Sequence, residues 1–151
     1  MSLVDRFWYI DFEGYCFEHY NVYIKEIAIL ASDTRTCYNY HVYHHTPTGL
    51  NRKFSNVARY QYHRHLLPWE FGDYDLLEAL TDIKNKISTD EVFVKGEGKF
   101  EYLKQFFPNI KCLPEEPSFY SLNNCLHETC NVNHGKYCAR RKVFELYYKY
   151  K

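Results

Sequence analysis

The residues best suited to metal chemistry are gathered between positions 125 and 138. Thiolate and imidazole groups at short spacings are ligands of tetrahedral Zn²⁺, and a closed structural site needs four of them. Cys130, His134 and Cys138 follow one another at intervals of four residues. A fourth ligand must come either locally, from Cys125 or His127, or from a distant part of the chain. The competing interpretation is a group of buried thiols, because cysteine without a metal behaves as a small hydrophobic residue.

A pair of carboxylates, Asp11 and Glu13, could hold a different kind of metal. Residues 4–12 are apolar, β-branched and aromatic, which predicts a buried strand. Side chains at positions i and i+2 of a strand lie on the same face, so Asp11 and Glu13 could share a divalent cation. Such acidic pairs are commonly just solvated. Their position at the end of the first strand favours a functional interpretation.

Glu26 is a third carboxylate of interest, because it lies within the apolar residues of a second predicted strand, 22–32. It could face outward from a half-buried strand. Alternatively it is buried and held by a metal, since an unpaired buried carboxylate is costly.

The elements that must position these residues follow a simple order. Residues 36–44 alternate strongly and predict a third strand, so the first three strands should form an antiparallel meander. Strand–helix alternation in the second half then calls for parallel pairing. The predicted later elements are a helix over 73–87 with Asp73 as N-cap, a strand over 91–96, a helix over 99–107, a strand over 110–113 and a helix over 139–150. The sequence therefore predicts an α/β fold with a mixed sheet.

Composition limits the classes of protein that remain. A chain of 151 residues is most simply one domain, 1–151. Its 19 Lys and Arg residues balance its 19 Asp and Glu residues, so the protein has no overall positive charge to attract nucleic acid. We find no apolar run long enough for a membrane span and no signal peptide, so no membrane contact is expected. The six cysteines then indicate reduced thiols in the cytoplasm or nucleus, with no disulfide-linked partner.

Cations mixed with aromatic residues indicate where single-stranded RNA could bind. Phosphates attract Lys and Arg, and bases stack on exposed rings. The irregular segment 45–72 offers Arg59, Tyr60, Tyr62 and Arg64, while the last helix offers a second set in Arg140, Arg141 and Lys142. For any one of these residues, a solvated surface charge is the simpler interpretation.

The segment Tyr9-Ile10-Asp11-Phe12-Glu13-Gly14 resembles the first motif of the DEDDh 3′–5′ exonucleases, whose fold is ribonuclease H-like. The resemblance implies that Asp11 and Glu13 would hold Mg²⁺ or Mn²⁺ if the protein is active. At the second motif this chain has Lys99 where the family has an aspartate, and the late aspartate is absent. These departures imply that the ordinary two-metal site is lost.

The same departures resemble the Maelstrom domain, an exonuclease-derived module of the piRNA pathway with a Glu-Cys-His-Cys zinc site. Carried over residue by residue, the resemblance implies Zn²⁺ ligands at Glu26, Cys130, His134 and Cys138. The implied function is a zinc-stabilised, catalytically degenerate domain that binds single-stranded RNA or a protein partner, in small-RNA or transposon silencing. The alternative is a metal-dependent nuclease that uses Asp11 and Glu13.

Overall fold

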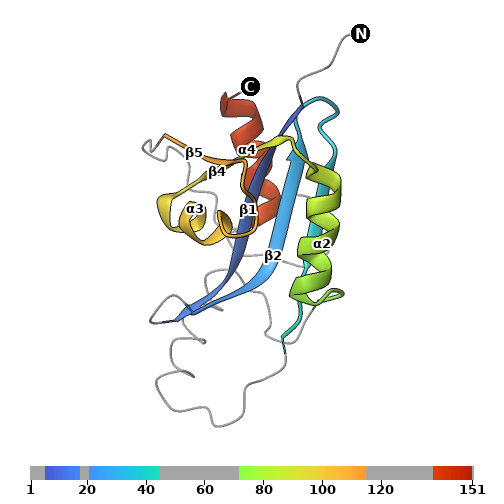
Figure 1. Ribbon diagram of the computed structural model, residues 1–151, viewed down its shortest axis with the longest axis vertical. Helices are drawn as coiled ribbons and strands as arrows, with labels where there is room; N and C mark the ends of the chain where they lie inside the picture. The colour runs from blue at the N-terminus through green and yellow to red at the C-terminus, as the bar shows by residue number, and fades with distance from the viewer. Residues whose placement is uncertain (1–5, 18–20, 45–71, 115–137, 151) are drawn as a thin grey trace.

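Five strands in the described part of the chain form one mixed sheet with the order β3-β2-β1-β4-β5 (Figure 1). A computed structural model describes residues 6–17, 21–44, 72–114 and 138–150. The strands are β1 (Phe7–Phe17), β2 (Asn21–Ala31), β3 (Cys37–His41), β4 (Glu91–Lys95) and β5 (Ile110–Leu113). The β1–β2 and β2–β3 pairs are antiparallel, and the β1–β4 and β4–β5 pairs are parallel. The predicted meander and the predicted parallel pairing are both confirmed.

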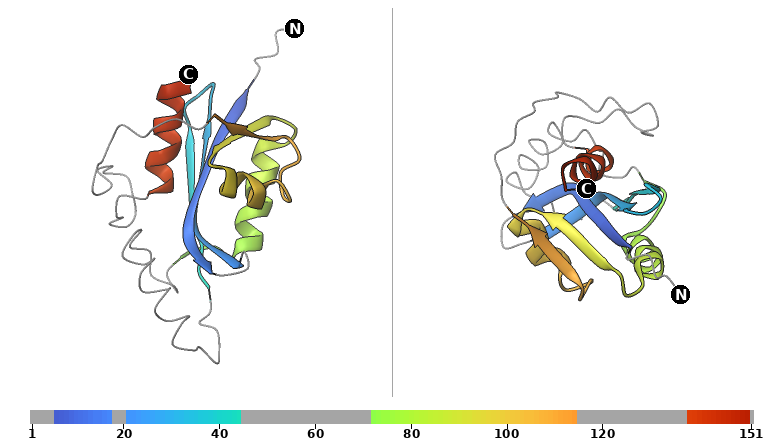
Figure 2. Two further views of the ribbon diagram at one scale, coloured as in Figure 1. Left: turned by 90° about the vertical axis from the view of Figure 1, so that its left-hand side faces the viewer. Right: turned by 90° about the horizontal axis from the view of Figure 1, so that it is seen from above.

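Helices cover both faces of this sheet and give the protein three layers. The helices in the described ranges are α2 (Leu76–Ile87), α3 (Glu97–Leu103) and α4 (Ala139–Tyr150). Figure 2 shows α4 on one side of the sheet and α2 and α3 on the other. None of these described helices is long and apolar enough to cross a membrane.

Each face of the sheet has its own apolar core, because the strands alternate between two buried faces. Trp8, Ile10 and Phe12 of β1 point to the core beneath α2 and α3. Tyr9 points the other way, into the smaller core beneath α4, where it meets Val143 and Leu146. Asp11 and Glu13 follow Tyr9 at two-residue intervals, so they continue the row of side chains on the α4 face.

The element boundaries correct several details of the sequence prediction. β1 continues to Phe17 instead of ending at residue 12. α2 begins at Leu76 and its N-cap is Asp75, so the prediction of Asp73 as N-cap was wrong. The Asp75 carboxylate accepts a hydrogen bond from the Glu78 N–H, and the Glu78 carboxylate accepts one from the Asp75 N–H, which is a capping box. α3 begins at Glu97 and ends at Leu103, earlier than the predicted 99–107. β5 and α4 have their predicted limits.

A β-bulge explains why β1 passes through Gly14 without stopping. The register of β1 with β2 shifts between Glu13, which lies opposite Glu26, and Gly14, which lies opposite Ile24. Lys25 is therefore the extra residue on β2. A Cβ on Gly14 would lie 2.2 Å from the Tyr23 carbonyl oxygen, so only glycine fits this close approach of the two strands.

Candidate functional site

Asp11 and Glu13 meet a lysine from another element. The Lys99 Nζ donates to Asp11 Oδ1 at 2.8 Å and to Glu13 Oε2 at 3.0 Å. The local folding explains this contact: β4 pairs with β1 only as far as Tyr9, ends at Lys95, and passes directly into α3. α3 therefore starts beside the unpaired edge of β1, and the Lys99 side chain crosses above the Phe12 ring to reach both carboxylates. The predicted shared face of Asp11 and Glu13 is confirmed.

Asp11, Glu13 and Lys99 form a partly buried cluster of three ionisable groups, and burial and neighbouring charges shift the pKa values of Asp11 and Lys99. Burial raises the pKa of Asp11 to about 7, although the charges of Lys99 and, more weakly, Lys142 on α4 lower it. Burial alone would lower the pKa of Lys99, but the charges of Asp11 and Glu13 raise it above its usual value. Lys99 is therefore cationic at neutral pH. Its side chain is 29% exposed, whereas that of Asp11 is 1% exposed.

One oxygen of Asp11 has no hydrogen-bond partner in the described part of the chain. Asp11 Oδ2 is buried and accepts no hydrogen bond from any residue in the described ranges. A buried acceptor that lacks a donor carries a desolvation cost. The ammonium group of Lys99 thus satisfies only one of the two oxygens of this carboxylate.

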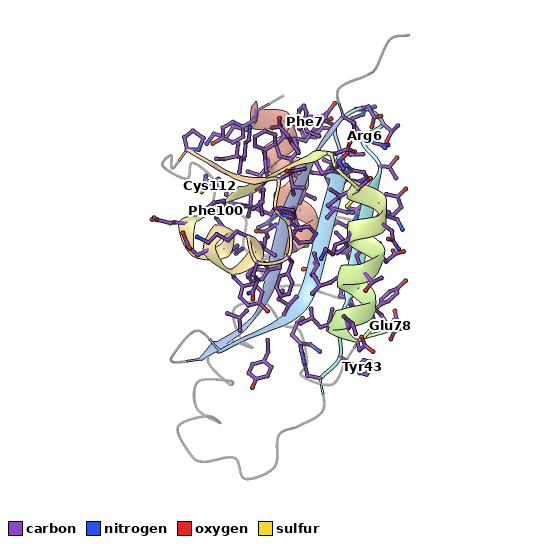
Figure 3. The ribbon with its side chains drawn as sticks, in the orientation of Figure 1. Arg6, Phe7, Tyr43, Glu78, Phe100 and Cys112 are labelled. Atoms are coloured by element: carbon purple, nitrogen blue, oxygen red, sulfur yellow. The ribbon has the colours of Figure 1, made fainter. Side chains whose placement is uncertain are left out.

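Three titratable residues form a transverse row across the same sheet face. Glu13 of β1 lies opposite Glu26 of β2, and Glu26 lies opposite His41 of β3. Glu26 and His41 are 0% and 2% exposed. Figure 3 labels Arg6 and Phe7 at one end of the sheet and Tyr43 at the other. His41, the member of the row on β3, precedes Tyr43 by two residues and so lies toward the Tyr43 end. Sequence reasoning missed His41, because its position depends on strand register and not on a local motif.

Glu26 is held by hydrogen bonds from two other elements. Its Oε1 accepts from the Ala139 N–H at 2.8 Å, and its Oε2 accepts from Asn39 Nδ2 at 3.0 Å. His41 Nε2 lies 3.8 Å from Oε2, and burial lowers the pKa of this histidine. Ala139 is the first residue of α4, so Glu26 satisfies an otherwise unpaired N–H at the positive end of the helix.

Glu26 is hydrogen-bonded to Ala139, the first residue of α4, and Cys138, another of the four predicted zinc ligands, is the next residue toward the N-terminus. Cys138 directly precedes Ala139, and its Sγ accepts from the Arg141 N–H at 3.4 Å. The other predicted ligands, Cys130 and His134, lie outside the described residues, as do the alternatives Cys125 and His127. Within the described ranges, no three His, Cys, Asp or Glu side chains are grouped closely enough to hold a metal ion. The donor types of Glu26 and Cys138 fit Zn²⁺.

The predicted RNA-binding residues of the last helix differ in their exposure. Arg141 is only 7% exposed, and its Nε lies 3.5 Å from Glu145 Oε1, so this side chain belongs to the protein interior. Arg140 and Lys142 are half-buried, with the Arg140 guanidinium above the Phe144 ring. The remaining predicted RNA contacts lie outside the described residues: Arg59, Tyr60, Tyr62 and Arg64.

No protein-family model and no curated protein sequence matches the chain. Its function must therefore be inferred from the site itself.

Proposed function

We propose that this chain is a catalytically degenerate, exonuclease-like domain with a ribonuclease H-like arrangement, which binds single-stranded RNA without cleaving it. The observation that carries the proposal is the position of Lys99. In two-metal phosphoryl transfer, divalent cations gathered by several carboxylates stabilise the attacking and leaving oxygens. Here an ammonium group lies within 3.0 Å of both Asp11 and Glu13.

The positive charge of Lys99 opposes divalent metal at this carboxylate pair. A metal ion in contact with Asp11 and Glu13 would lie within a few ångströms of the ammonium, where two like charges repel strongly in a partly enclosed site. The charges of Asp11 and Glu13 raise the pKa of Lys99, so a metal ion would have to displace a charged ammonium group from these carboxylates near neutral pH. The arrangement therefore supports binding over metal-dependent cleavage.

A binding assay with labelled single-stranded RNA in Mg²⁺, Mn²⁺ or EDTA tests the proposal. We expect a complex and intact RNA in all three conditions. Metal-dependent cleavage that disappears in Asp11→Asn would overturn it.

That outcome would establish the second candidate function, a residual nuclease that uses Asp11 and Glu13. Asp11 Oδ2, which accepts no hydrogen bond from the described residues, favours this candidate, because such a carboxylate oxygen is a potential metal ligand.

We propose further that Glu26, Cys130, His134 and Cys138 hold one structural Zn²⁺. The hydrogen bond from Ala139 to Glu26 supports this, because Cys138 directly precedes Ala139 and a metal held by both ligands would tie α4 to β2. Such a site contributes directly to folding free energy.

Metal analysis of the purified protein tests the zinc proposal. We expect about one Zn²⁺ per chain, lost in Cys138→Ser and retained in Cys112→Ser, which changes an exposed cysteine of β5. A metal-free wild type whose melting temperature does not respond to a chelator would refute it.

A further inference from the structure

We propose that Asn39 is a positioning residue for zinc: its side-chain amide holds the Glu26 carboxylate in the orientation in which Glu26 binds the metal. This inference rests on the proposed zinc site and adds to it a residue that is not itself a ligand. Asn39 lies on β3, at the end of the strand order, so it would connect the outermost strand to a metal that ties β2 to α4.

The Glu26 carboxylate is held from two sides. Asn39 Nδ2 donates to its Oε2 at 3.0 Å, and the Ala139 N–H donates to its Oε1 at 2.8 Å. Each oxygen therefore accepts from a different element, one from β3 and the other from α4. A carboxylate has about four lone-pair sites, so these two hydrogen bonds are compatible with metal ligation.

Strand register places Asn39 within reach of Glu26. His41 lies directly opposite Glu26, and Asn39 lies opposite Ala28, two residues along on the same face of the sheet. The side chain of Ala28 is a single methyl group, which leaves room for the Asn39 amide to reach along the sheet. His41 Nε2 is 3.8 Å from Glu26 Oε2, which is beyond hydrogen-bond distance. Of these two β3 side chains, Asn39 therefore makes the hydrogen bond.

The two donors are neutral, so they orient Glu26 without cancelling its negative charge. On the same face, Asp11 and Glu13 instead meet the Lys99 ammonium group. Glu26 is 0% exposed, so a donor that it loses is not replaced by bulk water. Hydrogen bonds to a metal-binding carboxylate fix its orientation, and their loss typically costs about 10- to 100-fold in metal affinity.

The test measures the zinc dissociation constant by competition with a chromogenic chelator for the wild type, Asn39→Ala, Glu26→Gln and the double variant. We expect Asn39→Ala to weaken zinc binding about 10- to 100-fold. In the Glu26→Gln background the same change should cost less than about twofold, because the carboxylate that Asn39 positions is gone. Asn85→Ala is the matched control. Asn85 is exposed on α2, on the other side of the sheet from α4 (Figure 2), so this variant should bind zinc as the wild type does.

Each other result overturns the inference in a distinguishable way. If Asn39→Ala binds zinc as tightly as the wild type, Asn39 does not position the ligand, but the zinc site stands. If Asn39→Ala costs as much in the Glu26→Gln background as in the wild type, its effect does not pass through Glu26. If the wild type binds no zinc, the proposed site and the inference fail together.

A second variant keeps the test valid if Asn39→Ala does not fold. Asn39→Val removes the amide donor and introduces a side chain that strands favour. This variant should fold and weaken zinc binding to the same extent, and wild-type affinity in it would overturn the inference.

Discussion

The raised pKa of Asp11 predicts an unusual dependence of stability on pH. In the folded protein this carboxyl titrates near pH 7, against 3.8 for the unperturbed group. Between these values the folded state binds more protons than the unfolded state, so the free energy of unfolding falls as pH rises from about 4 to about 7. Lys99 does not disturb this window, because its pKa is raised further from it.

The magnitude follows from the size of the shift. A difference of about 3 pKa units corresponds to about 4 kcal/mol at about 1.4 kcal/mol per unit, which is an upper limit for one coupled group. Asp11→Asn removes the titration while it keeps an acceptor oxygen for Lys99. The variant should therefore match the wild type near pH 4 and exceed its stability at pH 8, by at most about 4 kcal/mol.

Urea unfolding at several pH values, followed by circular dichroism, measures both free energies. The difference between wild type and variant isolates Asp11, because other titrations largely cancel. Glu101→Gln is the control. Glu101 is exposed and pairs with Lys104 instead of with the cluster, so its replacement should change stability by less than about 0.5 kcal/mol at pH 8. A wild type that is more stable than Asp11→Asn at pH 8 would refute the reasoning.

Three further predictions concern the bulge and the last helix. Gly14→Ala should destabilise the protein by more than about 2 kcal/mol in thermal or urea unfolding, because its Cβ would lie 2.2 Å from the Tyr23 carbonyl oxygen; wild-type stability would show that the strands can separate there. Arg140→Ala with Lys142→Ala should weaken single-stranded RNA binding several-fold in a fluorescence titration without unfolding the chain. Arg141→Ala should instead lower stability by about 1–2 kcal/mol, since this side chain is buried; the reverse pattern would contradict the exposure described for α4.

The sequence was sufficient for the fold where local pattern decides it. Alternation on the early strands and strand–helix alternation later predicted both kinds of pairing, and two-residue spacing placed Asp11 and Glu13 on one face. β1 was predicted too short because Glu13-Gly14 has the composition of a turn. In the folded chain a bulge absorbs Gly14, and the strand continues.

The site was less predictable, because it is assembled by register. Glu26 and His41 become neighbours only when β2 and β3 align, and a shift of one residue would turn His41 to the opposite face. The sequence leaves Glu26 either facing outward or buried and held by a metal. The structure buries it, and two hydrogen-bond donors, the Ala139 N–H and Asn39, satisfy it in part. No local sequence pattern reveals that a helix more than a hundred residues later supplies one of them.

The placement of α4 has a consequence for synthesis of the protein. This helix covers Tyr9 and Leu30 on the central strands, but it is translated long after them. Until α4 is made, the apolar side chains that it covers, Tyr9 and Leu30 among them, lack this helix as a packing partner. A nascent chain of this kind is open to aggregation or chaperone capture until α4 emerges and docks.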